Sequence, residues 1–180
     1  MQSAHTNRFR IVNYVGQFNF AKMNNIGVKS SEGEYVLLLN NDTEVITPDW
    51  VEQMLFFARD ESVGAVGAKL LYPNNRIQHA GVSGCALDVA FHAGQNLPSN
   101  TEAYNNYFSI SHESLAVTAA CLMISKQKYE SIDGLDELHV PNGFGDIDFC
   151  LGLRSKGYRN IFAADAVLIH KESPSRGVNI

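Results

Sequence analysis

The 180-residue chain has no basic stripe, no long apolar run and no pattern of a secretion signal. Its net charge is -5 at pH 7, and without a run of Lys or Arg it offers no surface suited to nucleic acid. No stretch reaches the ~20 apolar residues that a membrane span needs. Residues 1–10 are polar and lack the apolar core of a signal peptide. We therefore expect a soluble, cytosolic protein, able to work at the inner face of the membrane through a partner.

Cysteine is scarce, and its three copies (Cys85, Cys121 and Cys150) are an odd number in apolar or mixed surroundings. Their spacing does not match a zinc site, and so few thiols make no disulfide framework. We expect reduced, mostly buried thiols, as is usual in a cytosolic protein.

Hydrophobic residues make up 45% of the chain, enough for a core in one domain spanning residues 1–180. Strand and helix patterns alternate, which predicts an α/β fold. The first half of the chain predicts strands at Arg8–Val15, from Glu34, and at Val63–Tyr72. It also predicts a helix at Phe20–Lys29 capped by Asn19, and a second helix that starts at Thr47-Pro48-Asp49-Trp50 with Thr47 as its cap.

The second half is less regular. It predicts short strands within Ile77–Ala93 and a long loop at Gly94–Glu113, followed by an apolar run at Leu115–Ile124 and a short helix capped by Ser125. A helix at Asp146–Lys156, ended by Gly157, precedes short strands at Ile161–Ala163 and Val167–Ile169. Long loops in compact domains often act as lids or binding loops.

The apolar run Glu34–Leu39 ends abruptly in Asn40-Asn41-Asp42 and, after Thr43, Glu44. Such a run reads as a strand buried on both faces, and ligands of open α/β sheets bind beyond the carboxyl ends of these strands. Oxygen-bearing side chains there suit Mg²⁺ or Mn²⁺ bridging to a phosphate. A simple strand-ending turn remains the alternative, since Asn and Asp favour turns. An aspartyl-phosphatase is not indicated, because its nucleophile position is held by Asn40.

A second cluster is Phe144-Gly145-Asp146-Ile147-Asp148, at the start of a predicted helix. A carboxylate there is stabilised by free backbone N–H groups and the helix dipole, and most such residues do no more than that. Asp146, approached by a glycine-rich segment, is also a candidate general base that takes a proton from a hydroxyl.

His170 follows the last predicted strand and is a candidate metal ligand if the fold returns it to Asp42; otherwise it is an ordinary structural histidine. Arg176, in the polar tail, is a candidate for clamping a phosphate. His79 and His92 lie in glycine-spaced segments, and we interpret both as structural.

Taken in order, these segments resemble the family 2 glycosyltransferases, which are inverting enzymes with the GT-A fold. The resemblance is greatest to the bacterial subgroup that builds O-antigen and other surface polysaccharides, which includes rhamnosyltransferase-like members. The resemblance covers nearly the whole chain. The segments that carry it are Phe18–Gly27, Leu37–Val45, Gly64–Gly81, Val117–Met123, Gly134–Glu137, Asp146–Arg159 and His170–Gly177.

The resemblance implies a Rossmann-like mixed sheet flanked by helices, a nucleotide-sugar donor, a saccharide or lipid-linked saccharide acceptor, and a Mg²⁺ or Mn²⁺ cofactor. It implies that Asn40-Asn41-Asp42 takes the place of the Asp-x-Asp motif, with Asp42 and His170 at the metal. Asp146 matches the family's catalytic base, and Asn25 an asparagine near the nucleotide. Gly145 stands where the family has glutamate, and Asn24 where arginine is commoner.

Nothing before Phe18 resembles the strand–helix–strand unit that grips the nucleotide base in this family. We therefore expect an N-terminally truncated GT-A domain whose Glu34 strand has an open edge, a known route to association or to completion by another chain. A non-catalytic remnant or interaction domain is the alternative function.

Overall fold

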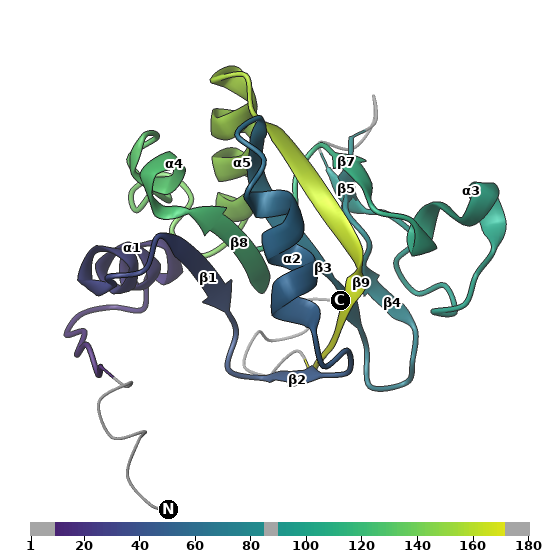
Figure 1. Cartoon of the computed structure of the whole chain (residues 1–180). Helices are drawn as coiled ribbons and strands as arrows, with labels where there is room; N and C mark the ends of the chain where they lie inside the picture. The colour runs from purple at the N-terminus through teal and green to yellow at the C-terminus, as the bar shows by residue number, and fades with distance from the viewer. Residues whose placement is uncertain (1–9, 85–89, 172–180) are drawn as a thin grey trace, which may run out of the picture.

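The computed structural model describes residues 10–84 and 90–171. Its core is a mixed sheet in the order β1-β8-β3-β9-β2, in which β4 pairs with β3 and β7 with β9 (Figure 1). The strands are β1 (Tyr35–Leu39), β2 (Thr43–Val45), β3 (Val63–Leu71), β4 (Ile77–His79), β5 (Val82–Ser83), β6 (Phe91–His92), β7 (His112–Ser114), β8 (Cys121–Ser125) and β9 (Arg159–His170). The helices are α1 (Phe20–Ser30), α2 (Trp50–Ala58), α3 (Ala103–Asn106), the 3-10 helix η1 (Tyr107–Ser109), α4 (Lys126–Glu130) and α5 (Gly145–Ser155).

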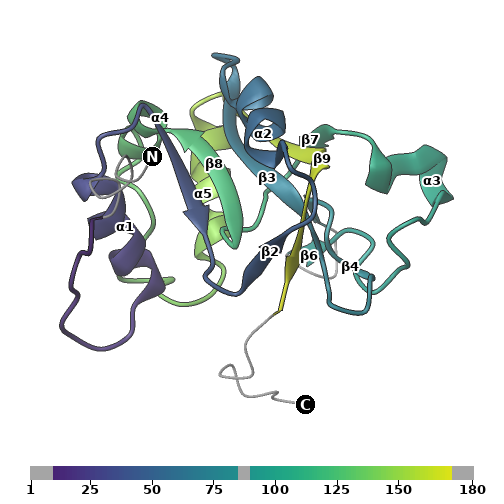
Figure 2. The same cartoon turned by 60° about the horizontal axis from the view of Figure 1, so that its bottom comes forward.

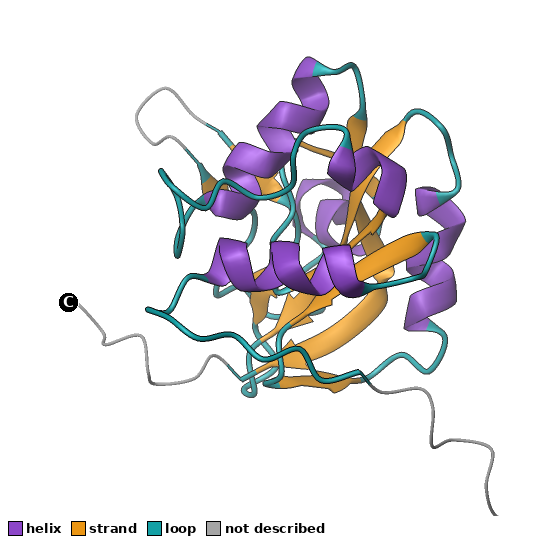
Figure 3. Ribbon diagram, turned by 90° about the vertical axis from the view of Figure 1, so that its left-hand side faces the viewer, coloured by secondary structure: helices purple, strands orange, loops and turns teal. Residues whose placement is uncertain are grey.

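Helices cover both faces of the sheet, as an α/β sequence predicts (Figure 3). Along β1, Val36 and Leu38 belong to the core beneath α1 and α5, whereas Tyr35 and Leu37 pack against the core beneath α2. The predicted strand is therefore confirmed, with one face buried and the other only partly buried. Burying a side chain of this size stabilises the fold by about 1.5–3 kcal/mol relative to exposure.

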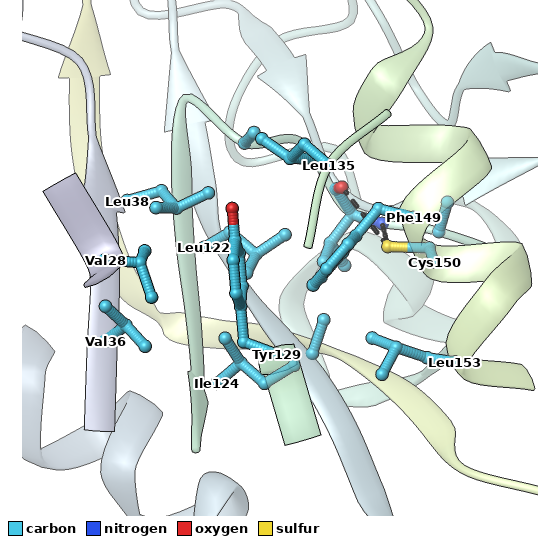
Figure 4. Packing of buried hydrophobic residues seen from close by; sticks show 14 of the residues in the cluster. Val28, Val36, Leu38, Leu122, Ile124, Tyr129, Leu135, Phe149, Cys150 and Leu153 are labelled. Carbon is cyan, nitrogen blue, oxygen red and sulfur yellow. Dashed lines mark hydrogen bonds between the residues drawn. The ribbon is translucent and has the colours of Figure 1, made fainter. Parts of the chain in front are cut away.

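The core under α5 brings distant segments together (Figure 4). Tyr129 of α4 and Phe149 of α5 lie with ring centroids 5.0 Å apart, and both are almost fully buried. Beside them the backbone N–H of Val117 approaches Cys150 Sγ at 3.4 Å. This packing fixes α5, and with it the Asp146 side chain, against the segment that leads into β8.

The thiols of Cys121 and Cys150 are free and buried, as expected. Burial raises the pKa of each to about 12, which makes both unreactive. Cys85 lies outside the described residues.

Local signals for helix ends are mostly confirmed. The side chains of Asn19 and Ser125 accept hydrogen bonds from the Lys22 and Lys128 backbone N–H groups, at 2.8 and 3.3 Å. Thr47 is different: Asp49 is the N-cap of α2, and Thr47 Oγ1 instead accepts from the Val167 N–H at 3.2 Å. The predicted cap is therefore wrong, because a neighbouring strand takes the hydroxyl.

Four predicted elements are corrected. Arg10–Val15 form no strand, and Ile11 and Val15 are 88% and 96% exposed, so their alternation has no face to bury; Arg8 and Phe9 lie outside the described residues. The two short strands predicted near the C-terminus are one, β9, because it runs beside β3 along its length. The 115–124 run becomes strand only from Cys121, and the predicted loop at 94–113 holds α3, η1 and β7.

Within the described parts of the chain, no helix has the length and apolar character needed to cross a membrane.

Candidate active site

A cleft of about 650 Å³ opens where β1 and β9 end and α5 begins. This end of the sheet faces forward in Figure 2. The cleft is lined by the predicted residues Asn40, Asn41, Asp42, Asp146 and His170, together with Gln78, His79, His92, Thr118, Ala119 and residues of the 18–24 and 140–145 segments. Five candidates from three distant segments of the chain therefore share one cavity.

Strand pairing returns His170 to Asp42. β2 runs antiparallel to β9 with Thr43 opposite His170, and the Lys171 N–H donates to the Asp42 carbonyl at 2.9 Å. As a result His170 Nε2 lies 3.1 Å from Asp42 Oδ1 and 3.1 Å from Asn40 Nδ2. The Asp42 and His170 side chains are only 19% and 12% exposed.

Gln78, which the sequence did not single out, holds His170 from the other side. Its Oε1 lies 2.7 Å from His170 Nδ1, and its Nε2 donates to the His170 carbonyl at 3.4 Å. An amide oxygen only accepts, so this contact assigns a proton to His170 Nδ1. The one signal available in the sequence was a polar residue between Ile77 and His79 in a segment predicted to hold short strands.

The residues of this corner fit a small divalent cation. Two ligands 3.1 Å apart match neighbouring positions on an ion that binds oxygen at about 2.1 Å. In the described parts of the chain no group of three His, Cys, Asp or Glu side chains gathers for a metal. One carboxylate and one imidazole suit an ion that completes its coordination with water and substrate phosphate, as Mg²⁺ and Mn²⁺ do.

Asp146 lies in the first turn of α5 and lines the same cleft. Its Oδ1 accepts from the Ile147 N–H at 3.0 Å, and its Oδ2 from the Ala119 N–H at 3.2 Å. The next residue, Ala120, accepts from the Asn40 N–H at 2.9 Å. The small residues of segment 117–121 thus join the carboxylate directly to the Asn40-Asn41-Asp42 turn.

His79 and His92 also reach the cleft. Their Nδ1 atoms are 2.8 Å apart, and His79 is 1% exposed. Burial, with the neighbouring His92, holds the pKa of His79 well below its ordinary value, so it is neutral. The structural interpretation fits His79, which also meets the Thr118 N–H at 3.5 Å.

One predicted donor-binding residue, Asn25, stands apart from the cleft. Asn25 does not line it; its Nδ2 donates to the Leu135 carbonyl and to Glu137, and its Oδ1 accepts from Tyr129 and from the Leu135 N–H. With both ends of the amide engaged, we assign Asn25 to supporting this turn rather than to donor contact. Arg176 lies outside the described residues.

Solved structures with a similar fold are glycosyltransferases. GalNAc-T7 with UDP, GalNAc and Mn²⁺ superposes with a TM-score of 0.66 at 11% identity, over 91% of this chain and 33% of the other. The mannosyltransferase PcManGT from Pyrobaculum calidifontis, with GDP-Man and Mn²⁺, gives 0.57 at 15% identity, over 87% and 37%. The catalytic domain of Drosophila β1,4-galactosyltransferase 7 with xylobiose gives 0.53 at 12%, over 89% and 54%. The chain has the GT-A fold. This likeness concerns the fold alone.

Curated proteins add sequence similarity. The chain is 42% identical over 170 residues to the uncharacterized protein y4gI of Sinorhizobium fredii and 37% identical over 167 residues to the O-antigen biosynthesis protein RfbC of Myxococcus xanthus. These matches cover 94% and 88% of this chain but 19% and 12% of the relatives, so the chain spans less than a fifth of either. No protein-family model matches it.

Proposed function

We propose that this chain carries the catalytic site of a metal-dependent, inverting glycosyltransferase of family 2. The enzyme moves a sugar from a nucleotide-sugar to a saccharide or lipid-linked saccharide, as a step in the synthesis of a cell-surface polysaccharide. The observation that carries the proposal is that Asp146 and the Asp42–His170 pair line one cleft of a GT-A fold. The similarity to RfbC supports the polysaccharide role.

The donor diphosphate occupies the Asp42 corner in this proposal. Asp42 and His170 would hold the cation, and Asn40 and Asn41 would offer amide groups to the phosphates. A bound Mg²⁺ or Mn²⁺ supplies positive charge beside the departing nucleoside diphosphate. The low exposure of Asp42 and His170 strengthens this electrostatic interaction relative to open water.

The acceptor hydroxyl approaches Asp146 from the other side of the cleft. Asp146 takes the hydroxyl proton as the oxygen bonds to the anomeric carbon, and the bond to the diphosphate breaks on the opposite face. The configuration at that carbon is therefore inverted. The N–H groups of Ala119 and Ile147 hold the carboxylate in position for this transfer.

The test is turnover of a panel of nucleotide-sugars with Mn²⁺ and a saccharide acceptor panel, measured as released nucleoside diphosphate. We expect Asp146→Asn to lower the rate by about 10²- to 10⁴-fold, the usual contribution of a general base. Mn²⁺ affinity should stay unchanged in that variant. Asp148→Asn is the matched control, since Asp148 shares the first turn of α5 but does not line the cleft.

Loss of Mn²⁺ binding in Asp146→Asn would contradict the role given to Asp146. A chain that binds neither nucleotide nor metal would instead favour a non-catalytic interaction domain.

A further inference from the structure

The geometry points to Gln78 as a positioning residue for His170: it fixes the imidazole in the Nδ1–H form, so that Nε2 presents a lone pair to a divalent cation beside Asp42. This inference rests on the proposed metal-dependent function. Gln78 itself does not contact the cation in this proposal.

The first line of support is the pair of bonds between Gln78 and His170. Its amide oxygen faces Nδ1 at 2.7 Å while its amide nitrogen donates to the His170 carbonyl at 3.4 Å. Reversing the amide would set its oxygen against the His170 carbonyl oxygen, so the bond to the carbonyl selects the orientation that leaves Oε1 facing Nδ1. Gln78 is 7% exposed, and this burial makes an unmet amide group costly.

The second line of support lies on the other side of the ring. Asn40 Nδ2 approaches Nε2 at 3.1 Å, which requires that Nε2 accept. Nε2 also lies 3.1 Å from Asp42 Oδ1, so the imidazole and the carboxylate meet at the same corner of the cleft. Free histidine favours the proton on Nε2, so the protein selects the rarer form, the one whose Nε2 is ready to bind a metal.

The position of Gln78 explains how the contact is built. β4 pairs with β3, with Leu70 opposite His79, while β3 runs parallel to β9 with Leu71 opposite Ile169. β4 therefore brings Gln78 to the end of β9. Partners that orient a metal-bound histidine typically contribute about 10- to 100-fold to metal affinity.

The experiment compares wild type, Gln78→Leu, Gln78→Glu and Gln95→Leu. The His170 tautomer is read without metal by long-range ¹⁵N–¹H correlation of the imidazole at mildly alkaline pH, assigned with a His170→Asn variant. Mn²⁺ affinity is measured separately by electron paramagnetic resonance. Gln95 is the matched control, because it lines the same cleft but donates to the Tyr72 hydroxyl at 2.9 Å.

We expect the Nδ1–H form in wild type and its loss in Gln78→Leu, with Mn²⁺ binding about 10- to 100-fold weaker. Gln78→Glu should recover the Nδ1–H form, because its carboxylate accepts the same hydrogen bond, although it cannot donate to the His170 carbonyl. Gln95→Leu should match wild type. An unchanged tautomer in a folded Gln78→Leu would overturn the role of Gln78 and leave the proposed function standing. No Mn²⁺ binding by wild type, despite the expected tautomer change, would overturn the metal site itself.

Discussion

Asn24 and Asn25 are neighbours in α1 whose side chains have different surroundings. Asn24 lines the cleft and donates to the Phe20 carbonyl at 2.8 Å, one turn back in its own helix. Asn25 joins α1 to the turn at Leu135 and to Tyr129, which is 3% exposed. The resemblance to the family 2 glycosyltransferases predicted that Asn25 lies near the nucleotide. The contacts of Asn25 in the structure instead indicate a role in stability.

Asn25→Ala should lower the free energy of unfolding by on the order of 2–4 kcal/mol, because it leaves buried groups of Tyr129 and Leu135 without a partner. Asn24→Ala should cost under about 1 kcal/mol, since it loses one local bond. Urea unfolding measures both. A folded Asn25→Ala that loses only Mn²⁺-dependent nucleotide binding would restore Asn25 to the donor site.

His79 should make stability depend on pH. Its pKa is lowered well below the ordinary value by burial and by His92, so as pH falls below ~6.5 the unfolded chain takes up a proton that the folded chain does not. Stability is therefore lost as pH falls from ~6.5 toward the lower folded pKa, by at most about 1.4 kcal/mol per pH unit from this group.

Replacing His79 by Gln removes that titration. Unfolding free energies measured across this range should fall less steeply with acid in His79→Gln than in wild type, even if the variant is less stable at every pH. Equal slopes would show that His79 is not the group that resists protonation.

At the scale of elements, the packing of β3 against segment 117–121 requires a glycine at position 67. A Cβ on Gly67 would lie 2.4 Å from Val117 Cβ, closer than packing allows, whereas a Cβ on Gly152 in α5 would meet Ile132 Cδ1 at an ordinary 3.5 Å. The close approach of β3 to segment 117–121 therefore sets the backbone that bonds Asp146.

Gly67→Ala should destabilise the protein by about 1–3 kcal/mol through overpacking. Gly152→Ala should be neutral or stabilise it by up to about 1 kcal/mol, as expected when Ala replaces Gly inside a helix. Thermal unfolding of the two variants gives the comparison. Similar losses in both would mean that the Gly67 contact is not what limits packing.

The elements also show what a sequence can predict here. The caps Asn19 and Ser125 accept hydrogen bonds from residues three positions ahead in the chain, so the local sequence was enough to predict them. The Arg8–Val15 pattern was misleading, because a strand needs a partner and alternation alone does not supply one. Asp42 and Asp146 could be proposed from strand-end and helix-start signals. Gln78 could not, since its contact with His170 depends on the pairing of β3 with both β4 and β9.

For the whole molecule, the sheet ends at β1, whose ladder partner among the described residues is β8 alone. Leu39, at the end of β1, is 44% exposed. Such an edge offers unpaired backbone groups to another strand. We propose that the chain associates with another copy of itself through this edge.

Sedimentation velocity over a range of concentrations should show association that Leu39→Lys weakens, because charge on an edge strand opposes pairing. Phe56→Lys is the control: Phe56 is 73% exposed but lies on α2, away from β1. A monomer at all concentrations, or equal effects of the two variants, would argue against the β1 edge.

The central claim, that this cleft binds a nucleotide-sugar through a cation, is tested most directly by isothermal titration of nucleoside diphosphates into the chain with and without Mn²⁺. We predict weak binding that appears only with Mn²⁺, is lost in Asp42→Ala and is kept in Asp146→Asn. No binding of any nucleoside diphosphate, or binding indifferent to both Mn²⁺ and Asp42, would contradict it.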